Sequence, residues 1–446
     1  MSRPNIVVIM TDDQDAASMA VMPNVRRLLV DQGTSYTNSY ASYSLCCPSR
    51  ATFMTGQYAH NHKVLDNQWP DGGYRRLPKE TLPLWLGRSG YATVHIGKFL
   101  NQYGHDPEEI PPGWQEWYGL VGNFAYKMWG YRINENGTVR RYGKQKRENP
   151  KLYQTDVLAN KAVNYIKRRA KSDRPFFLSF APLAPHTEPP WKGDPDGTWR
   201  GPRPAPRHRG MFAKRPLPRP PSFNETDVKD KPRHLRPDRM SAARIKQVTA
   251  DYRMRLESLQ AVDEAVARIV RTVAEAGELD RTLFVFTSDN GYLLGQHRWP
   301  SNKTHPYEES IRIPLVLRGP GFAKGRKVAT PVVNVDLPAT ILSVTGARAP
   351  VPTDGRPLQE LARSNRARDV LIETGPRSSG AHWYAAIRTD RYLYVEHSTG
   401  ARELYDLVTD PYQLSSKHND PRTAPLQVTL SQRLRKLRVC SGRACP

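Results

Sequence analysis

The stretch that decides the fold is Asn5-Ile6-Val7-Val8-Ile9-Met10-Thr11-Asp12-Asp13. A short apolar run that ends in polar residues is typical of a buried strand. The pattern returns late in the chain as Thr282-Leu283-Phe284-Val285-Phe286-Thr287-Ser288-Asp289-Asn290. In open α/β sheets, ligands gather at the carboxyl ends of the strands, which is where both runs carry their acidic residues. The sequence therefore predicts a ligand site at that edge of an α/β sheet.

Further elements support this architecture. Phe176–Phe180 and Pro314–Arg318 are two more apolar runs of strand length. A long amphipathic helix is predicted from about Ala250 to Ala276, where apolar residues recur at helical spacing. Pro23–Leu29 is a shorter predicted helix with proline near its first turn. Strands that alternate with helices predict a sheet covered by helices on both faces.

The chain has 446 residues, a length that predicts one large domain and a smaller one. Near residues 347–357 the composition turns to Pro, Gly and Arg, which marks the expected boundary. We therefore expect a catalytic domain at residues 1–348 and a small α+β domain at 349–446. In the small domain, alternating runs predict an antiparallel sheet and a closing helix; these runs are Val370–Glu373, Trp383–Arg388, Tyr392–Glu396 and the helical Val428–Leu437.

A segment at about residues 187–238 is dense in Pro and Arg and lacks periodicity. Long irregular insertions of this kind form lids or binding walls. A disordered surface loop explains the same composition, and the sequence leaves both interpretations open.

The formal net charge is +24, from 67 Lys and Arg against 43 Asp and Glu. Such a field attracts polyanions, either nucleic acid or a sulfated or phosphorylated substrate. A solvated, Arg-rich surface is the plainer explanation. No compact basic run or nucleic-acid motif is present, and nucleic-acid binding would leave Asp12, Asp13 and Asp289 unexplained. We therefore expect no nucleic-acid partner.

The four cysteines fall into two pairs. Cys46 and Cys47 are adjacent, which disfavours a bond between them. Cys440 and Cys445 flank a short turn and are expected to form a disulfide, the alternative being two free thiols. A disulfide implies an oxidising compartment and hence export. The start of the chain shows no signal peptide, and no apolar run is long enough to span a membrane.

A second stretch carries the chemistry: Cys46-Cys47-Pro48-Ser49-Arg50, continuing to Thr55-Gly56. It resembles the signature of the type I sulfatase family, in which a formylglycine-generating enzyme oxidises the first Cys to formylglycine (3-oxoalanine). The resemblance implies an alkaline-phosphatase-like fold, with a large mixed sheet flanked by helices and a small C-terminal domain. The chain is most similar to the N-acetylglucosamine-6-sulfatase and heparan endosulfatase branch. The segments that carry this similarity are Ser44–Arg50, His60-Asn61-His62, Gly97–Asn101, Pro111–Trp114 and Cys440-Ser441-Gly442.

The resemblance also implies a mechanism. Hydrated formylglycine at position 46 is a geminal diol, and one hydroxyl attacks sulfur, displaces the alcohol and forms a sulfo-enzyme. The second hydroxyl then lets the carbonyl re-form, which expels sulfate. Arg50, one turn along the expected helix, is expected near the diol and the sulfate.

Three carboxylates and an amide oxygen form an oxygen-rich set suited to Ca²⁺ or Mg²⁺; they belong to Asp12, Asp13, Asp289 and Asn290. The resemblance implies that these residues hold a divalent ion, usually calcium, with the modified Cys46 as a further ligand. It also implies that Lys98 and Lys303 bind the sulfate. By the same resemblance, His186 is the candidate general acid, assisted by His297. His60 and His62 are expected either to reach the substrate or to form a hydrogen-bonded loop pair.

Two departures from the family pattern bear on substrate fit. Many sulfatases have His two residues after the motif Lys, where this chain has Leu100. Related sequences also read Gly-Tyr-His after the Asp-Asn pair, where this chain has Leu293.

The sequence therefore predicts a sulfuric ester hydrolase that cleaves O-sulfate monoesters from a sulfated, N-acetylglucosamine-6-sulfate-like sugar and from aryl sulfates. A phosphonate monoester or phosphodiester hydrolase of the same superfamily is the alternative. A glycan-binding protein with a dead site is disfavoured, because Cys46 and the acidic ligands are all present.

Overall fold

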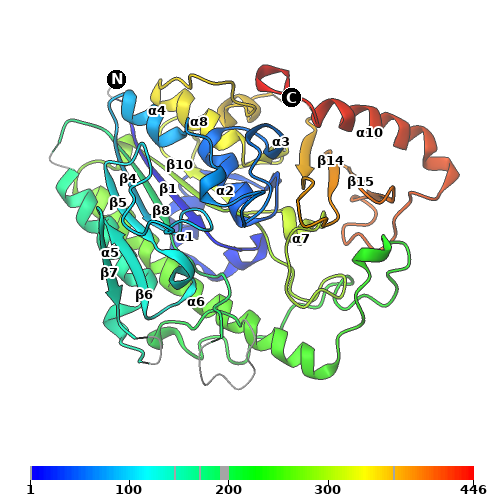
Figure 1. Cartoon of the computed structure of the whole chain (residues 1–446), viewed down its shortest axis with the longest axis horizontal. Coiled ribbons are helices and arrows are strands. Elements are labelled where there is room, and N and C mark those ends of the chain that lie inside the picture. The colour runs from blue at the N-terminus through cyan, green and yellow to red at the C-terminus, as the bar shows by residue number, and fades with distance from the viewer. Residues whose placement is uncertain (1–2, 145–146, 170–171, 191–199, 365–366) are drawn as a thin grey trace.

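The computed structural model describes residues 3–144, 147–169, 172–190, 200–364 and 367–446. Among these residues, ten strands form one mixed sheet (Figure 1). In spatial order the strands are β11 (Arg326–Val328), β2 (Thr34–Tyr36), β10 (Leu315–Arg318), β9 (Thr282–Ser288), β1 (Asn5–Thr11), β8 (Phe176–Ala181), β4 (Ala92–Gly97), β5 (Glu116–Leu120), β6 (Tyr131–Glu135) and β7 (Thr138–Tyr142).

Strand β1 lies at the centre of the sheet, parallel to both β8 and β9. Thr11 at the end of β1 is in register with Ser288 at the end of β9. Every residue of these three strands is buried, which explains why their sequences read as continuous apolar runs. The predicted strands are therefore confirmed, and their carboxyl ends meet at one edge.

The two faces of β1 pack against different helices. Val7 and Ile9 share a core with α5 (Gln154–Arg169) and α6 (Ala242–Glu275). The alternate residues Ile6 and Val8 face a second core, whose helices are α2 (Cys46–Thr55), α4 (Leu82–Arg88) and α8 (Asp336–Thr345). Helices cover both faces, so the predicted α/β class is confirmed.

Helix boundaries differ from the prediction in two places. Helix α6 begins at Ala242, about two turns before the predicted start, because Ser241 caps it by accepting a hydrogen bond from the backbone N–H of Arg244 at 3.2 Å. The predicted helix at 23–29 is α1 (Pro23–Val25) continued by a π-helical turn at Arg26–Val30.

A separate antiparallel sheet forms at the other end of the molecule from α5 and β7 (Figure 1). Its strands are β13 (Val370–Glu373), β14 (Tyr384–Arg388), β15 (Tyr392–His397) and β16 (Arg402–Asp406), with α10 (Ala424–Leu437) packed on them. The predicted small sheet and closing helix are thus present. Cys440 and Cys445 form the expected disulfide just after α10.

Smaller elements complete the fold. They are α3 (Ala59–His62), α7 (Glu308–Ile311), α9 (Leu358–Leu361) and a two-stranded ladder of β3 (Ser39–Tyr40) with β12 (Val332–Val333). No helix among the described residues is long and apolar enough to cross a membrane.

The structure describes the Pro/Arg-rich segment at residues 187–190 and from residue 200 onward, and residues 191–199 lie outside the described residues. The described part is irregular but anchored to the helical layer. Arg207 donates to Asp156 of α5 at 2.6 and 2.7 Å, and His208 lies 2.8 Å from Glu264 of α6. From residue 200 onward the segment thus packs against the domain by charged contacts.

Candidate active site

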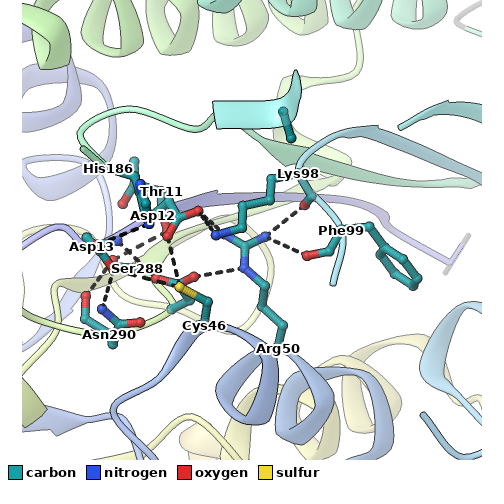
Figure 2. A network of polar contacts seen from close by, with 12 residues as sticks. Thr11, Asp12, Asp13, Cys46, Arg50, Lys98, Phe99, His186, Ser288 and Asn290 are labelled. Carbon is teal, nitrogen blue, oxygen red and sulfur yellow. Dashed lines mark hydrogen bonds and ion pairs between the residues drawn. The ribbon is translucent and has the colours of Figure 1, made fainter. Parts of the chain in front are cut away.

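Four loops at the carboxyl edge of the large sheet and the first turn of α2 meet in one buried cluster (Figure 2). Asp12 and Asp13 follow β1, Lys98 follows β4, and Asp289 and Asn290 follow β9. The neighbouring positions of β1, β8, β9 and β4 in the sheet bring together residues that are far apart in the sequence.

The acidic residues and Asn290 are joined by direct hydrogen bonds. The Asp13 backbone N–H donates to Asp289 Oδ1 at 3.0 Å, and Asn290 Nδ2 donates to Asp13 Oδ1 at 2.7 Å. Asp13 has a φ of 63°, in the left-handed region that non-glycine residues rarely adopt. The four nominated metal ligands that carry a carboxylate or an amide are all buried at this one place.

Cys46 begins α2 and points into the acidic cluster. Its Sγ lies 3.4 Å from Asp12 Oδ1 and 3.9 Å from Asp13 Oδ1. The first turn of α2 is tied to the β9 loop, because the Ser49 hydroxyl donates to the Asp289 carbonyl. Burial, with the nearby Asp12 carboxylate, raises the pKa of the Cys46 thiol to about 12. An unmodified thiol at this position is therefore a weak nucleophile at neutral pH.

Three buried cations balance the carboxylates. Lys98 forms an ion pair with Asp12, and Lys303 forms one with Asp13 while its Nζ lies 2.8 Å from Cys46 Sγ. Burial opposes ionisation of Asp12, but Lys98, His186 and Arg50 outweigh it and hold the pKa of Asp12 well below its usual range. The cluster thus combines ionised carboxylates with two lysines directed at the same centre.

Arg50 connects two of the loops that form the cluster (Figure 2). Its Nε donates to Asp289 Oδ2 at 2.8 Å, and Nη1 donates to the Lys98 carbonyl at 2.8 Å. The guanidinium therefore links the β9 loop to the β4 loop, and its Nη2 forms an ion pair with Asp12 Oδ2 at 3.6 Å.

The donor set fits a hard divalent cation. Asn290 Oδ1 is a buried oxygen without a hydrogen-bond partner, whereas Asp12 Oδ2 is ion-paired with Lys98 and Asp13 Oδ2 lies 3.6 Å from His186 Nε2. Ligand atoms of Asp12, Asp13, Cys46 and His186 lie within 4.8 Å of one another. Carboxylate and amide oxygens suit Ca²⁺ or Mg²⁺ better than softer metals.

His186 lies at the rim of the cluster after β8. Its Nε2 is 3.6 Å from Asp13 Oδ2, while Nδ1 is 2.7 Å from the Thr187 carbonyl oxygen. A hydrogen bond from Nδ1 to this carbonyl leaves Nε2 facing the cluster. Burial lowers the pKa of His186 to about 4.

His297 lies apart from these residues. Its Nδ1 contacts Glu225 Oε2 at 2.7 Å, and its ring packs 4.1 Å from that of Tyr307. No hydrogen bond or ion pair among the described residues joins His297 to the cluster, so its assisting role stays a prediction. His60 contacts Glu373 and the Cys440 carbonyl, and His62 contacts Thr52; both are hydrogen-bonded residues of α3.

Two residues at the site were not singled out from the sequence. Tyr126 packs its ring 4.9 Å from Lys98 Nζ and 4.9 Å from the His186 ring. Arg255 of α6 donates to the Asp13 carbonyl and, at 2.9 Å, to the Pro185 carbonyl. Arg255 is a charged residue on the apolar stripe of α6, and this irregularity in the sequence could have identified it. Tyr126 lies in a stretch without a motif, so no sequence signal marks it.

Comparison with known proteins agrees with the geometry. The family profile described as Sulfatase matches residues 4–347, and the profile described as N-sulphoglucosamine sulphohydrolase, C-terminal, matches residues 295–440. An arylsulfatase of Volvox carteri is 33% identical over 99% of this chain and 76% of its own length. The N-acetylglucosamine-6-sulfatase of Homo sapiens is 32% identical over 99% of this chain and 86% of its own length.

Solved structures share the whole architecture. BT4656, in complex with its substrate D-glucosamine-2-N,6-O-disulfate, superposes with a TM-score of 0.78 at 25% identity, covering 97% of each chain. The phosphonate monoester hydrolase of Agrobacterium radiobacter superposes with a TM-score of 0.73 at 22% identity, covering 98% of this chain and 95% of its own. The second similarity establishes the fold alone.

Proposed function

Because this chain belongs to the sulfatase family and hydrolyses sulfate esters, we propose that its natural substrate is the 6-O-sulfate of an amino sugar such as N-acetylglucosamine. The proposal is supported by similarity to the human N-acetylglucosamine-6-sulfatase along almost the whole chain. It is supported further by the structural likeness to BT4656, whose substrate is a 6-O-sulfated glucosamine. Aryl sulfates are proposed as synthetic substrates, in keeping with the arylsulfatase relative.

The nucleophile is proposed to be Cys46 after oxidation to formylglycine by a formylglycine-generating enzyme. The observation that carries this step is the position of Cys46 at the start of α2, with its Sγ 2.8 Å from Lys303 Nζ. One hydroxyl of the hydrated aldehyde attacks sulfur, and the S–O bond to the sugar breaks. The second hydroxyl then loses its proton, the C=O bond re-forms, and the C–O bond to sulfate breaks.

Asp12, Asp13, Asp289 and Asn290 are proposed to hold a divalent cation, Ca²⁺ or Mg²⁺, with the modified Cys46. The close grouping of these buried side chains, and the lack of a hydrogen-bond partner for Asn290 Oδ1, support this assignment. When bound, the cation supplies Lewis acidity that lowers the pKa of a hydroxyl and neutralises sulfate oxygens.

The basic residues are proposed to bind sulfate, to protonate the leaving group and to position the loops of the cluster. Lys98 and Lys303 are proposed to bind sulfate oxygens, and the position of both ammonium groups at the cluster supports this role. His186 is proposed to protonate the leaving sugar oxygen through Nε2, which faces the cluster. Arg50 keeps Asp289 and the Lys98 loop in place.

Phosphonate monoester hydrolysis is the alternative, because an enzyme with that activity shares this fold. The test compares three substrates with enzyme co-expressed with a formylglycine-generating enzyme: N-acetylglucosamine 6-sulfate, 4-nitrophenyl sulfate, and the phosphonate monoester 4-nitrophenyl phenylphosphonate. Higher kcat/KM on both sulfates supports the proposal. Higher kcat/KM on the phosphonate would replace it with the alternative.

We propose that the protein is exported, because Cys440 and Cys445 form a disulfide. Disulfides persist in oxidising compartments and are rare in reducing ones. Fractionation of the native host, with the protein detected by mass spectrometry, tests this proposal.

A further inference from the structure

A cavity of about 620 Å³ opens beside the cluster. Lys98 and Tyr126 belong to its wall, so the cavity borders the catalytic centre at Lys98, whose Nζ atom is itself buried. Its size falls within the range of about 300–1,000 Å³ typical of small-ligand pockets. The outer wall comes from two other loops, at residues 68–75 and 100–105.

A chain of contacts connects the catalytic centre to the outer wall. Tyr126 packs against Lys98, and its hydroxyl accepts a hydrogen bond from Asn101 Nδ2 at 2.8 Å. The next residue in the sequence is Gln102, whose Oε1 accepts a hydrogen bond from the Trp69 backbone N–H at 2.9 Å. The wall is thus held in place from Lys98 outward to Trp69.

Trp69 is unusual for its exposure. Its side chain is 55% exposed, whereas Trp85, Trp117 and Trp129 are fully buried. The backbone around Trp69 is fixed by the bonds Gly72 N to Gln68 O at 2.7 Å and Leu65 N to Asp71 O at 2.7 Å. An indole held open on an ordered loop provides a flat apolar surface for a ligand.

Arg75 provides unused positive charge on the same wall. It is exposed, and its guanidinium forms no ion pair or hydrogen bond with the part of the chain that the structure describes. An unpaired guanidinium beside a pocket is suited to an oxyanion, which it can hold with paired N–H donors.

We infer that this cavity binds the sugar ring that carries the scissile sulfate, with Trp69 stacking on the ring and Arg75 holding a second anionic substituent of that ring. The inference rests on the proposed function, since it takes Lys98 as the sulfate-binding end of the pocket. A pyranose has an apolar C–H face for the indole. The substrate class is therefore a sugar 6-sulfate with a further sulfate group.

The first experiment compares Trp69→Ala with the wild type on N-acetylglucosamine 6-sulfate and on 4-nitrophenyl sulfate. We expect KM for the sugar to rise about tenfold more than KM for the aryl sulfate, because the stacking contact is lost. Trp69→Phe should recover most of the sugar affinity. Equal effects on both substrates, or no effect on the sugar, would overturn the assignment of Trp69.

The second experiment compares glucosamine 2-N,6-O-disulfate with N-acetylglucosamine 6-sulfate. Arg75→Ala should raise KM for the disulfate about tenfold relative to the monosulfate, because one charge-assisted contact is lost. Arg76→Ala is the matched control, since Arg76 is the exposed neighbour outside the cavity wall, and should leave both values unchanged. An equal effect of Arg75→Ala on both sugars would overturn the assignment of Arg75.

Binding to a Cys46→Ala background, measured by calorimetry, separates the cavity from the catalysis. We expect Trp69→Ala to weaken binding of N-acetylglucosamine 6-sulfate about tenfold there as well. If the unsubstituted enzyme cleaves no sulfate while this difference persists, the proposed function fails and the cavity assignment stands. If the enzyme cleaves sulfates and the difference is absent, the cavity assignment fails alone.

Discussion

Lys303 Nζ lies 2.8 Å from the Sγ atom of Cys46, although 257 positions separate the two residues in the sequence. The same ammonium group forms an ion pair with Asp13. A single cation therefore touches both the residue proposed to attack sulfur and a residue proposed to hold the metal. The ammonium is well placed to stabilise negative charge that develops on a sulfate group at this point.

Replacement of Lys303 by Ala should lower kcat/KM for 4-nitrophenyl sulfate by about 10²–10³-fold, as found when a donor to a developing oxyanion is removed. Lys214→Ala is the matched control, because Lys214 is exposed and lies on the Pro/Arg-rich segment. Thermal melting of both variants separates loss of catalysis from loss of folding. A Lys303→Ala enzyme that is folded, metal-loaded and fully active would contradict the assignment.

His186→Ala should discriminate between leaving groups. A sugar alkoxide needs a proton to leave, so kcat for N-acetylglucosamine 6-sulfate should fall by about 10²–10⁴-fold. Nitrophenolate leaves without protonation, so the loss on 4-nitrophenyl sulfate should be smaller. His297→Ala is the comparison, because His297 contacts Glu225 rather than the cluster. Equal losses on both substrates for His186→Ala would argue against a general acid at this position.

Asp289→Asn should weaken divalent-cation binding. Because the ion binds the native state, Ca²⁺ at roughly 100 times its Kd should add about 2.7 kcal/mol to the free energy of unfolding. The variant should lose most of this Ca²⁺-dependent stabilisation, measured by denaturant unfolding with and without a chelator. Asp280→Asn, at the exposed opposite end of β9, should keep it. A variant with undiminished Ca²⁺ stabilisation would remove Asp289 from the ligand set.

Glu264→Gln tests how the Pro/Arg-rich segment is anchored to α6. Burial opposes ionisation of Glu264, but hydrogen bonds from His208 and Arg207 outweigh it and lower its pKa to about 2. A depressed carboxyl pKa stabilises the native state above the unfolded value, and this stability is lost as the pH falls toward the folded value. The wild type should therefore melt at a higher temperature than the variant at pH 7, and the difference should shrink below about pH 4.5.

The control for that experiment is Glu275→Gln, since Glu275 is exposed near the end of the same helix. It should not change the melting temperature at either pH. A pH-independent difference for Glu264→Gln would mean that the carboxylate charge does not anchor the segment.

The strands that build the site could be predicted from the sequence. β1 and β9 are buried on both faces, so each appears as an unbroken apolar run ending in acidic residues. In contrast, β7 has the sequence Thr-Val-Arg-Arg-Tyr and is largely exposed at the edge of the sheet. It therefore lacks the apolar run by which a buried strand is predicted. The first two turns of α6 were missed for the same reason, because few of their residues are buried.

Pairwise contacts within the site could not be derived from spacing. Lys98 and Lys303 were nominated by resemblance, but their pairing with Asp12 and Asp13 depends on how the loops fold back over the sheet edge. His297 was also nominated by resemblance, but it does not join the cluster. Its ring instead contacts Glu225 of the Pro/Arg-rich segment. A segment without periodicity gives no sequence signal for such a partner.

The most direct test of the central claim is the mass of the tryptic peptide Leu28–Arg50 from protein co-expressed with a formylglycine-generating enzyme. The account predicts that residue 46 carries the aldehyde, while Cys47 in the same peptide stays a thiol. The modified fraction should rise in proportion to sulfatase activity across preparations. Full sulfatase activity from protein in which Cys46 is wholly unmodified would contradict the account.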